Sequence, residues 1–128
     1  MSSTPPITVA TEDRQELQKL VERHSGSEVA ELLEVELDRA KVVPLSEVPQ
    51  GTVVMNSDVE YEDTSSHQRR QLRLVFPSDA DPEAGRISVM APLGCALLGL
   101  TVGQEIDWQM PGGQRRLRVI SVTRAPAQ

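Results

Sequence analysis

The stretch that decides the fold lies in the second half of the chain and reads Ile87-Ser88-Val89-Met90-Ala91-Pro92-Leu93-Gly94-Cys95-Ala96-Leu97-Leu98-Gly99-Leu100. Pro92 suits the first position of a helix, where its missing N–H is not needed. Gly99 suits the left-handed residue that follows a helix end. Because the residues between them are apolar or small, the pattern predicts one short buried helix.

Segments of alternating apolar residues lie on both sides of this helix. A period of two is typical of strands that bury one face. Five strands are expected, at residues 53–61, 68–76, 86–91, 105–110 and 115–122, with Pro111-Gly112-Gly113 as the turn between the last two. Residues 52–124 are therefore predicted to form an α+β domain, a mostly antiparallel sheet with a single helix on it.

The first forty residues carry a different pattern, in which apolar residues recur every three or four positions. The two apolar stripes contain Leu17, Leu20, Val21 and His24, and then Val29, Leu32, Leu33, Leu37 and Ala40. Thr11 is the expected N-cap of the first helix, and Ser25 with Glu28 fits a capping box for the second. The short connection at Gly26 makes the two helices antiparallel neighbours. Residues 1–43 are thus predicted to form a short coiled-coil hairpin about 20 Å long.

Pro44 and Pro49 bracket the predicted linker between the two units, residues 44–51. Net charge is −6 and the sequence pI is about 4.9, so attraction to nucleic acid or an anionic membrane is not expected. A protein partner is the more natural expectation. The start of the chain has no secretory signal pattern and no run of 18 apolar residues occurs. We therefore expect a cytoplasmic monomer.

Few residues offer chemistry. The single cysteine, Cys95, lies in the apolar stretch, far in sequence from both histidines, His24 and His67. This distribution supplies neither an activated nucleophile nor a zinc site. Three aromatic residues are too few to build stacking platforms or a deep aromatic-lined pocket. We expect no catalytic residue, no cofactor and no metal.

The hairpin tip is acidic. Glu28 and Glu31 are three residues apart and therefore lie on the same side of the second helix. Such a pair could hold a divalent cation or bind a basic surface. A solvated acidic face that continues through Glu34 and Asp38 is the simpler interpretation. Two clusters of arginine, at 69–73 and 115–118, likewise fit the solvent face of a sheet or a docking patch for an acidic partner.

The pattern from Ile87 to Gly113 resembles the C-terminal domain of the bacterial Gre transcript-cleavage factors. The resemblance continues in residues 30–40 and 54–57 and covers nearly the whole chain. Within this superfamily the sequence is most similar to the short-hairpin family known as regulator of nucleoside diphosphate kinase. The resemblance implies an FKBP-like fold for the C-terminal domain.

The resemblance also implies binding to RNA polymerase at the rim of its secondary channel, in competition with Gre factors, and an effect on nucleoside diphosphate kinase levels. Gre factors carry Asp-Ser-Pro where this chain has Met90-Ala91-Pro92, so an ionic contact is replaced by an apolar one that also includes Leu93. The hairpin is too short to bring Glu28 and Glu31 to the polymerase active centre. Cleavage activity is therefore not expected.

Two other functions stay open, because a fold does not fix a function. An FKBP-like fold would also be compatible with a prolyl isomerase. The active site of such an enzyme needs an aromatic-lined pocket, which three aromatic residues are too few to build. An acidic hairpin could instead belong to an adaptor that binds a basic protein unrelated to transcription.

Overall fold

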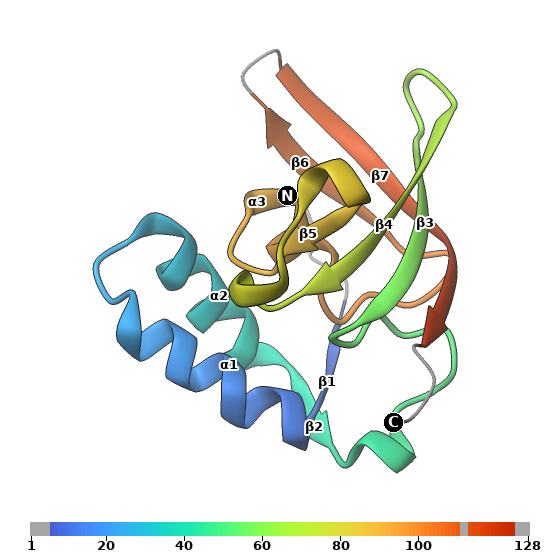
Figure 1. The fold of residues 1–128 in the computed structure, drawn as a ribbon. Coiled ribbons are helices and arrows are strands. Elements are labelled where there is room, and N and C mark those ends of the chain that lie inside the picture. The colour runs from blue at the N-terminus through green and yellow to red at the C-terminus, as the bar shows by residue number, and fades with distance from the viewer. Residues whose placement is uncertain (1–5, 111–112, 125–128) are drawn as a thin grey trace.

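An N-terminal helical hairpin and a five-stranded sheet make up the chain (Figure 1). The computed structural model describes residues 6–110 and 113–124. The hairpin consists of α1 (Thr11–Arg23) and α2 (Glu28–Arg39), joined by residues 24–27. A third helix, α3 (Pro92–Leu97), forms in the apolar stretch where a short helix was predicted. Gly99, which follows it, has a φ of 83°, in the left-handed region. The predicted α+β class with its hairpin and buried helix is confirmed, whereas the FKBP-like comparison stays a prediction.

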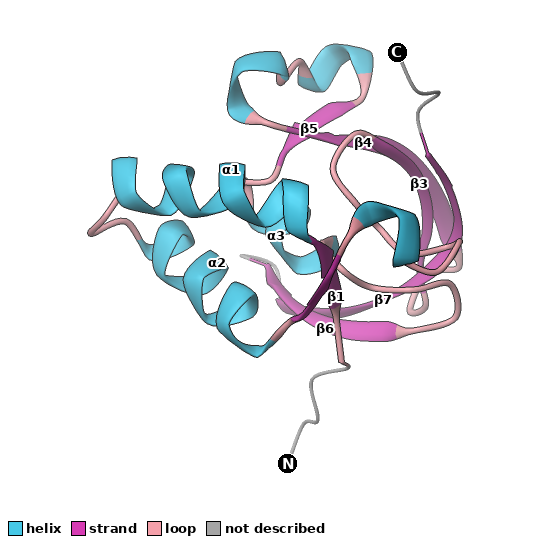
Figure 2. Cartoon of the chain, turned by 90° about the horizontal axis from the view of Figure 1, so that it is seen from below, coloured by secondary structure: helices cyan, strands magenta, loops and turns pink. Residues whose placement is uncertain are grey.

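The strands of the main sheet are β3 (Ser57–Asp63), β4 (Gln68–Val75), β5 (Arg86–Ser88), β6 (Glu105–Met110) and β7 (Gly113–Arg124). Their order is β5-β4-β3-β7-β6, and every pair is antiparallel except β4 with β5. A bulge interrupts the β3–β7 register at Glu60 and Tyr61. Figure 2 shows the sheet curving around the side that faces α3 and the hairpin. The predicted turn at residues 111–113 lies largely outside the described residues.

The hairpin helices span nearly the predicted residues, but their N-caps differ from the prediction. Thr11 is the first helical residue of α1, and Ala10 occupies the N-cap without a side-chain hydrogen bond. Ser27 caps α2, where its hydroxyl accepts a hydrogen bond from the Ala30 N–H at 3.1 Å. The cap expected at Ser25 therefore lies two residues later.

The apolar stripe of α2 is rotated from the predicted one. Ala30, Leu33 and Leu37 are buried, but Leu32 is 56% exposed and Val35 is 59% exposed. At about 100° per residue, positions 30, 33 and 37 fall within about 60° of one another, while position 32 points well away from them. The prediction that Leu32 packs inside the hairpin is wrong.

A small sheet that the sequence did not predict closes the base of the hairpin. Its two strands, β1 (Thr8–Ala10) and β2 (Lys41–Val43), are parallel, with Thr8 paired to Lys41. Three-residue strands are too short to display an alternating pattern, which is why periodicity missed them. They tie the start of α1 to the end of α2.

The linker is fixed to its surroundings by hydrogen bonds. The carboxylate of Glu12 accepts from the Leu45 N–H at 3.0 Å, next to a short 3₁₀ turn, Leu45–Glu47. The carboxylate of Asp13 accepts from the Met55 N–H at 3.1 Å, and burial raises the pKa of Asp13. Arg124, at the end of β7, donates to two carbonyl oxygens of the linker at 2.7 and 2.9 Å.

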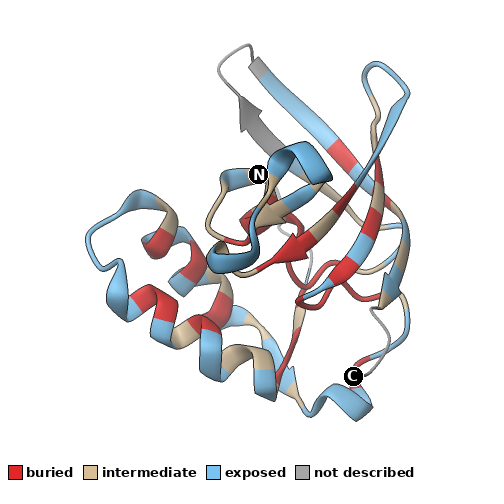
Figure 3. Cartoon of the chain, viewed as in Figure 1, coloured by how far each residue is buried: buried red, intermediate tan, exposed pale blue. Residues whose placement is uncertain are grey.

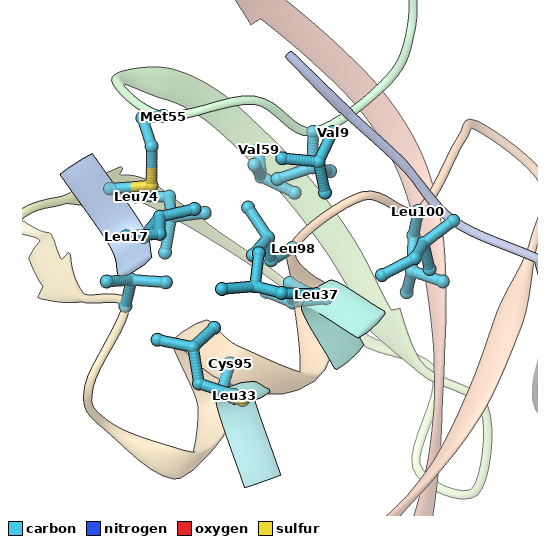
Figure 4. Packing of buried hydrophobic residues seen from close by; sticks show 14 of the residues in the cluster. Val9, Leu17, Leu33, Leu37, Met55, Val59, Leu74, Cys95, Leu98 and Leu100 are labelled. Carbon is cyan, nitrogen blue, oxygen red and sulfur yellow. The ribbon is translucent and has the colours of Figure 1, made fainter. Parts of the chain in front are cut away.

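One main cluster of buried side chains runs from the hairpin into the sheet domain (Figure 3). Leu17 and Leu33 enter it from the hairpin, and Leu74 enters it from β4. Figure 4 shows Leu33 of α2 and Cys95 of α3 among the side chains of this cluster. Because the two units share this core, the packing fixes how α2 lies against α3.

Candidate functional site

Four predicted site residues are brought together by the turn between β5 and α3, which we call the 88–93 turn. The Ser88 hydroxyl accepts a hydrogen bond from the Met90 N–H at 2.9 Å, and the Ser88 carbonyl accepts one from the Ala91 N–H at 2.9 Å. Pro92 then begins α3, as predicted. These bonds hold Met90, Ala91 and Leu93 in a fixed turn.

The surface of this turn is apolar and partly open. Pro92 is exposed, while Met90, Ala91 and Leu93 are of intermediate burial. Met90 and Leu93 pack against the main core on one side, so part of each side chain remains available to a partner. The turn carries no charged side chain. Its chemistry therefore suits apolar contact better than ionic contact.

Leu93 also lines a shallow surface cleft beside the turn. Two adjoining hollows of about 370 and 390 Å³ share Tyr61, Arg70 and Leu93 as lining residues. Tyr61 of β3 and Arg70 of β4 are cross-strand neighbours. Burial raises the pKa of Tyr61, and the nearby positive charge of Arg70 partly opposes this. The cleft thus combines the apolar side chain of Leu93 with the phenol of Tyr61 and the guanidinium of Arg70, and Arg115, which also lines it, is paired with Asp63 at 2.6 Å.

Sequence reasoning missed Tyr61 as a site residue, and it placed Arg70 only within the basic cluster at 69–73, not beside Tyr61 and Leu93. Arg70 shares one face of β4 with Leu72 and Leu74, because side chains two apart point to the same side of a sheet. An arginine that continues an apolar face is the signal that could have found it. Among the described residues no carboxylate forms an ion pair with Arg70, so its charge remains available to a partner.

The predicted acidic pair is not part of this cleft. Glu28 and Glu31 lie in the first turn of α2, at the hairpin tip, and both are exposed. No group of three metal-ligating side chains occurs among the residues that the structure describes. Their acidic charge favours the helix N-terminus, where the helix dipole is positive.

Most arginines of the two predicted basic clusters are paired across the solvent face of the sheet. Arg73 contacts Asp58 at 2.8 Å, and Arg118 contacts Glu105 at 2.6 Å. These contacts lower the pKa of Asp58 and of Glu105. Because the charges on this face are largely matched, it presents no uniform basic patch to an acidic partner.

Cys95 is buried within α3, and burial raises the pKa of its thiol to about 11. A thiol in this state is a poor nucleophile at neutral pH. His24 and His67 are both exposed, in the hairpin loop and in the β3–β4 turn. In the described part of the chain, no helix is both long and apolar enough to cross a membrane.

The sequence matches two family models that together cover all of the described residues except 44–47. The model of the GreA/GreB transcription elongation factor C-terminal domain matches residues 48–124. The model of the Rnk N-terminus matches residues 5–43. The boundary between the matches falls within the linker that carries the 3₁₀ turn.

Individual proteins agree with these matches. The chain is 39% identical over 113 residues to the regulator of nucleoside diphosphate kinase of Escherichia coli K12, covering 87% of this chain and 83% of the relative. It is 37% identical over 86 residues to transcription elongation factor GreA of Syntrophobacter fumaroxidans, covering 67% of this chain and 55% of that factor.

A solved structure, described as a prokaryotic transcription elongation factor GreA/GreB from Nitrosomonas europaea, superposes with a TM-score of 0.78. It is 42% identical, and the superposition covers 93% of this chain and 98% of that one. The chain therefore belongs to the regulator of nucleoside diphosphate kinase family, within the GreA/GreB superfamily.

Proposed function

We propose that this protein regulates transcription by binding RNA polymerase at the rim of the secondary channel, where it competes with Gre cleavage factors. The observation that carries the proposal is the apolar 88–93 turn, which opens onto the cleft of Tyr61, Arg70 and Leu93. It lies in the domain matched by the Gre C-terminal model. Tyrosine and arginine beside an apolar anchor are a common composition for a binding hot spot.

The length of the hairpin separates binding from cleavage. α1 has 13 residues and α2 has 12, so the prong is about 20 Å long. A tip at this distance from the sheet domain leaves Glu28 and Glu31 short of a metal deep inside a channel. In this proposal the protein therefore occupies the rim of the channel without stimulating transcript cleavage.

An effect on nucleoside diphosphate kinase belongs to the same proposal. A relative that shares 39% identity carries this role in its name. We expect the effect to act on the level of the kinase, through transcription. Purified kinase mixed with this protein should keep its activity, and a direct change in that activity would contradict this part of the proposal.

The binding surface is tested by Met90→Asp. A carboxylate at Met90 would be buried without a partner in an apolar contact, and such burial costs several kcal/mol. We expect the Kd for purified bacterial RNA polymerase to rise about a hundredfold or more. Val102→Asp is the matched control, because Val102 is an exposed apolar residue at 50% on a separate loop.

Circular dichroism must show that both variants are folded. An unchanged polymerase Kd in folded Met90→Asp would remove the 88–93 turn from the proposed interface. No polymerase binding by the parent protein would reject the proposed function as a whole.

Competition is tested by titrating this protein into a cleavage reaction of a Gre factor on backtracked RNA. Two ligands that share one site exclude each other by mass action, so cleavage should fall as the protein is added. The protein alone should leave the RNA intact. Acceleration by the protein alone, or an undiminished Gre reaction at saturation, would refute this mechanism.

A further inference from the structure

The outer edge of β4 is open over the first part of the strand. β5 pairs with β4 only at residues 73–75. The chain before β5 does not continue this pairing, because the Gly85 N–H donates to the Pro82 carbonyl at 3.1 Å. Figure 1 shows the β3–β4 hairpin extending past the end of β5. Within the described part of the chain, residues 68–71 therefore form an uncovered strand edge, which we call the β4 open edge.

The alternation of hydrogen bonds along β4 decides which backbone groups this edge presents. The Arg73 N–H points toward β5, where it donates to the Gly85 carbonyl at 2.8 Å. In an antiparallel pair, alternate residues direct their N–H and C=O groups to the same neighbour. Arg69 and Gln71 therefore direct theirs to the open edge, and Arg70 directs its groups to β3. Such a row of unpaired donors and acceptors is a template for another strand.

Two arginines of the β4 open edge carry unmatched charge. Arg69 and Arg70 are both exposed, and neither is ion-paired with any described residue. Glu62, the cross-strand neighbour of Arg69, instead contacts His67 at 3.6 Å and Arg118 at 4.0 Å. The sheet arginines that do contact carboxylates are Arg73, Arg86, Arg115, Arg116 and Arg118. Because adjacent side chains of a strand point to opposite faces, the open edge presents one positive charge on each face of the sheet.

The two charges select among the strands that could occupy the edge. Charged side chains on an edge strand oppose pairing with an identical edge. A second β4 would set Arg69 and Arg70 against the same two arginines. An extended acidic segment would complete the backbone hydrogen bonds and also neutralise both charges. Since its own side chains alternate between the two faces, two consecutive acidic residues would reach both arginines.

We propose that the β4 open edge binds an extended acidic segment of a partner protein, which adds to the main sheet as a strand in line with β5. Backbone hydrogen bonds to Arg69 and Gln71 supply affinity, and two consecutive acidic side chains supply specificity. The inference is independent of the proposed function, because Arg69 and Gln71 lie outside the 88–93 turn and its test needs no polymerase.

The probe is a fluorescein-labelled peptide of about seven residues, with two consecutive glutamates between valines and threonines. Fluorescence anisotropy measures its Kd for the full chain. The same peptide with lysines in place of the glutamates should bind at least about tenfold more weakly. Hydrogen exchange measured by NMR should slow at the Arg69 and Gln71 amides when the glutamate peptide is added. The Arg70 amide, already bonded to β3, should change little.

Two variants separate the charges from the backbone. The double variant Arg69→Gln with Arg70→Gln should raise the Kd of the glutamate peptide about tenfold or more and remove its advantage over the lysine peptide. Arg23→Gln, at an exposed arginine of α1, is the matched control and should bind as the parent does. Gln71→Pro removes one N–H from the open edge while leaving the bonds to β3, and it should also weaken binding.

Modified peptides give the backbone test from the side of the ligand, so it does not depend on the folding of Gln71→Pro. Two glutamate peptides are N-methylated, each at one of the two alternating sets of backbone nitrogens. Only alternate residues of an added strand face β4. One of the two peptides should therefore lose binding, and the other should keep it.

Several results would overturn the inference. These are no binding of the glutamate peptide at millimolar concentration, equal binding of the lysine peptide, or binding that neither N-methylated set disturbs. If the parent is a dimer in sedimentation and Gln71→Pro is a monomer, a second copy occupies the edge and the inference also fails. Polymerase binding is a separate measurement, so failure of either proposal leaves the other standing.

Discussion

A methyl group at Gly94 would strike the backbone that shapes the 88–93 turn. A Cβ built on this residue meets the carbonyl oxygen of Ser88 at a sub-contact distance and meets Leu74 Cδ1 at 3.0 Å. The Ser88 carbonyl cannot yield freely, because it accepts the hydrogen bond from the Ala91 N–H at 2.9 Å. Gly94→Ala should therefore displace the turn or α3.

Gly94→Ala will either raise or lower the free energy of unfolding, and the direction shows whether the close contact with Ser88 outweighs the higher helix propensity of alanine. Alanine is favoured over glycine inside a helix by about 1 kcal/mol, so without the contact the variant would be more stable. Overpacking against rigid backbone costs about 3 kcal/mol, and loss of the Ala91 hydrogen bond costs about 1 kcal/mol more. The net expectation is a fall of about 3 kcal/mol in the free energy of unfolding.

Urea unfolding followed by circular dichroism measures this change, and the Tm should fall by roughly 10 °C. Polymerase binding by the folded fraction of Gly94→Ala gives a second readout, since displacement of Met90 should weaken it. A Gly94→Ala protein as stable as the parent, or more stable, would refute the claim that α3 needs glycine to approach Ser88.

Three further results are expected. Leu33→Ala should lower the free energy of unfolding by about 3 kcal/mol in urea titrations, whereas Leu32→Ala should change it by less than about 0.5 kcal/mol; similar losses from both would restore the originally predicted stripe, which contains both residues. Asp13→Asn keeps an acceptor for the Met55 N–H, and burial raises the pKa of Asp13. At pH 7 the variant should therefore have a higher free energy of unfolding than the parent, and this difference should shrink as pH falls below the raised pKa; a difference that stays constant with pH would contradict this. With its pKa at about 11, Cys95 should be alkylated by iodoacetamide at pH 8 on the order of a hundredfold more slowly in the folded chain than in urea, and equal rates would show that the thiol is accessible.

Elements with a sustained period could be predicted from the sequence, and those without one could not. The 13 residues of α1 and the eight of β4 repeat their pattern often enough to be recognised. β1 and β2 have three residues each and form only because the hairpin brings residues 8 and 41 together. Such pairing depends on contacts distant in sequence.

The rotation of α2 about its own axis shows a second reason why the sequence alone does not predict every buried residue. Leu32 and Leu33 are adjacent and equally apolar, so periodicity alone does not say which one faces the core. The tertiary packing decides it, because Leu33 joins the core cluster to which Cys95 and Leu97 of α3 also belong, whereas Leu32 is 56% exposed (Figure 4). Dependence on tertiary contacts is also why the cleft was not predicted from the sequence. Tyr61 and Arg70 meet only after β3 and β4 pair, and the partial exposure of Met90 and Leu93 depends on how far the core extends beneath them.

The shared core has a consequence for the proposed binding surface. The 88–93 turn leads into α3, and Leu33 of α2 belongs to the same core cluster against which Met90 and Leu93 pack. Leu33→Ala, which lies outside the turn, should therefore weaken polymerase binding as well, because it loosens the packing that supports the turn. The Kd of the folded variant for purified RNA polymerase measures this effect. An unchanged Kd would show that the turn does not depend on how the hairpin packs.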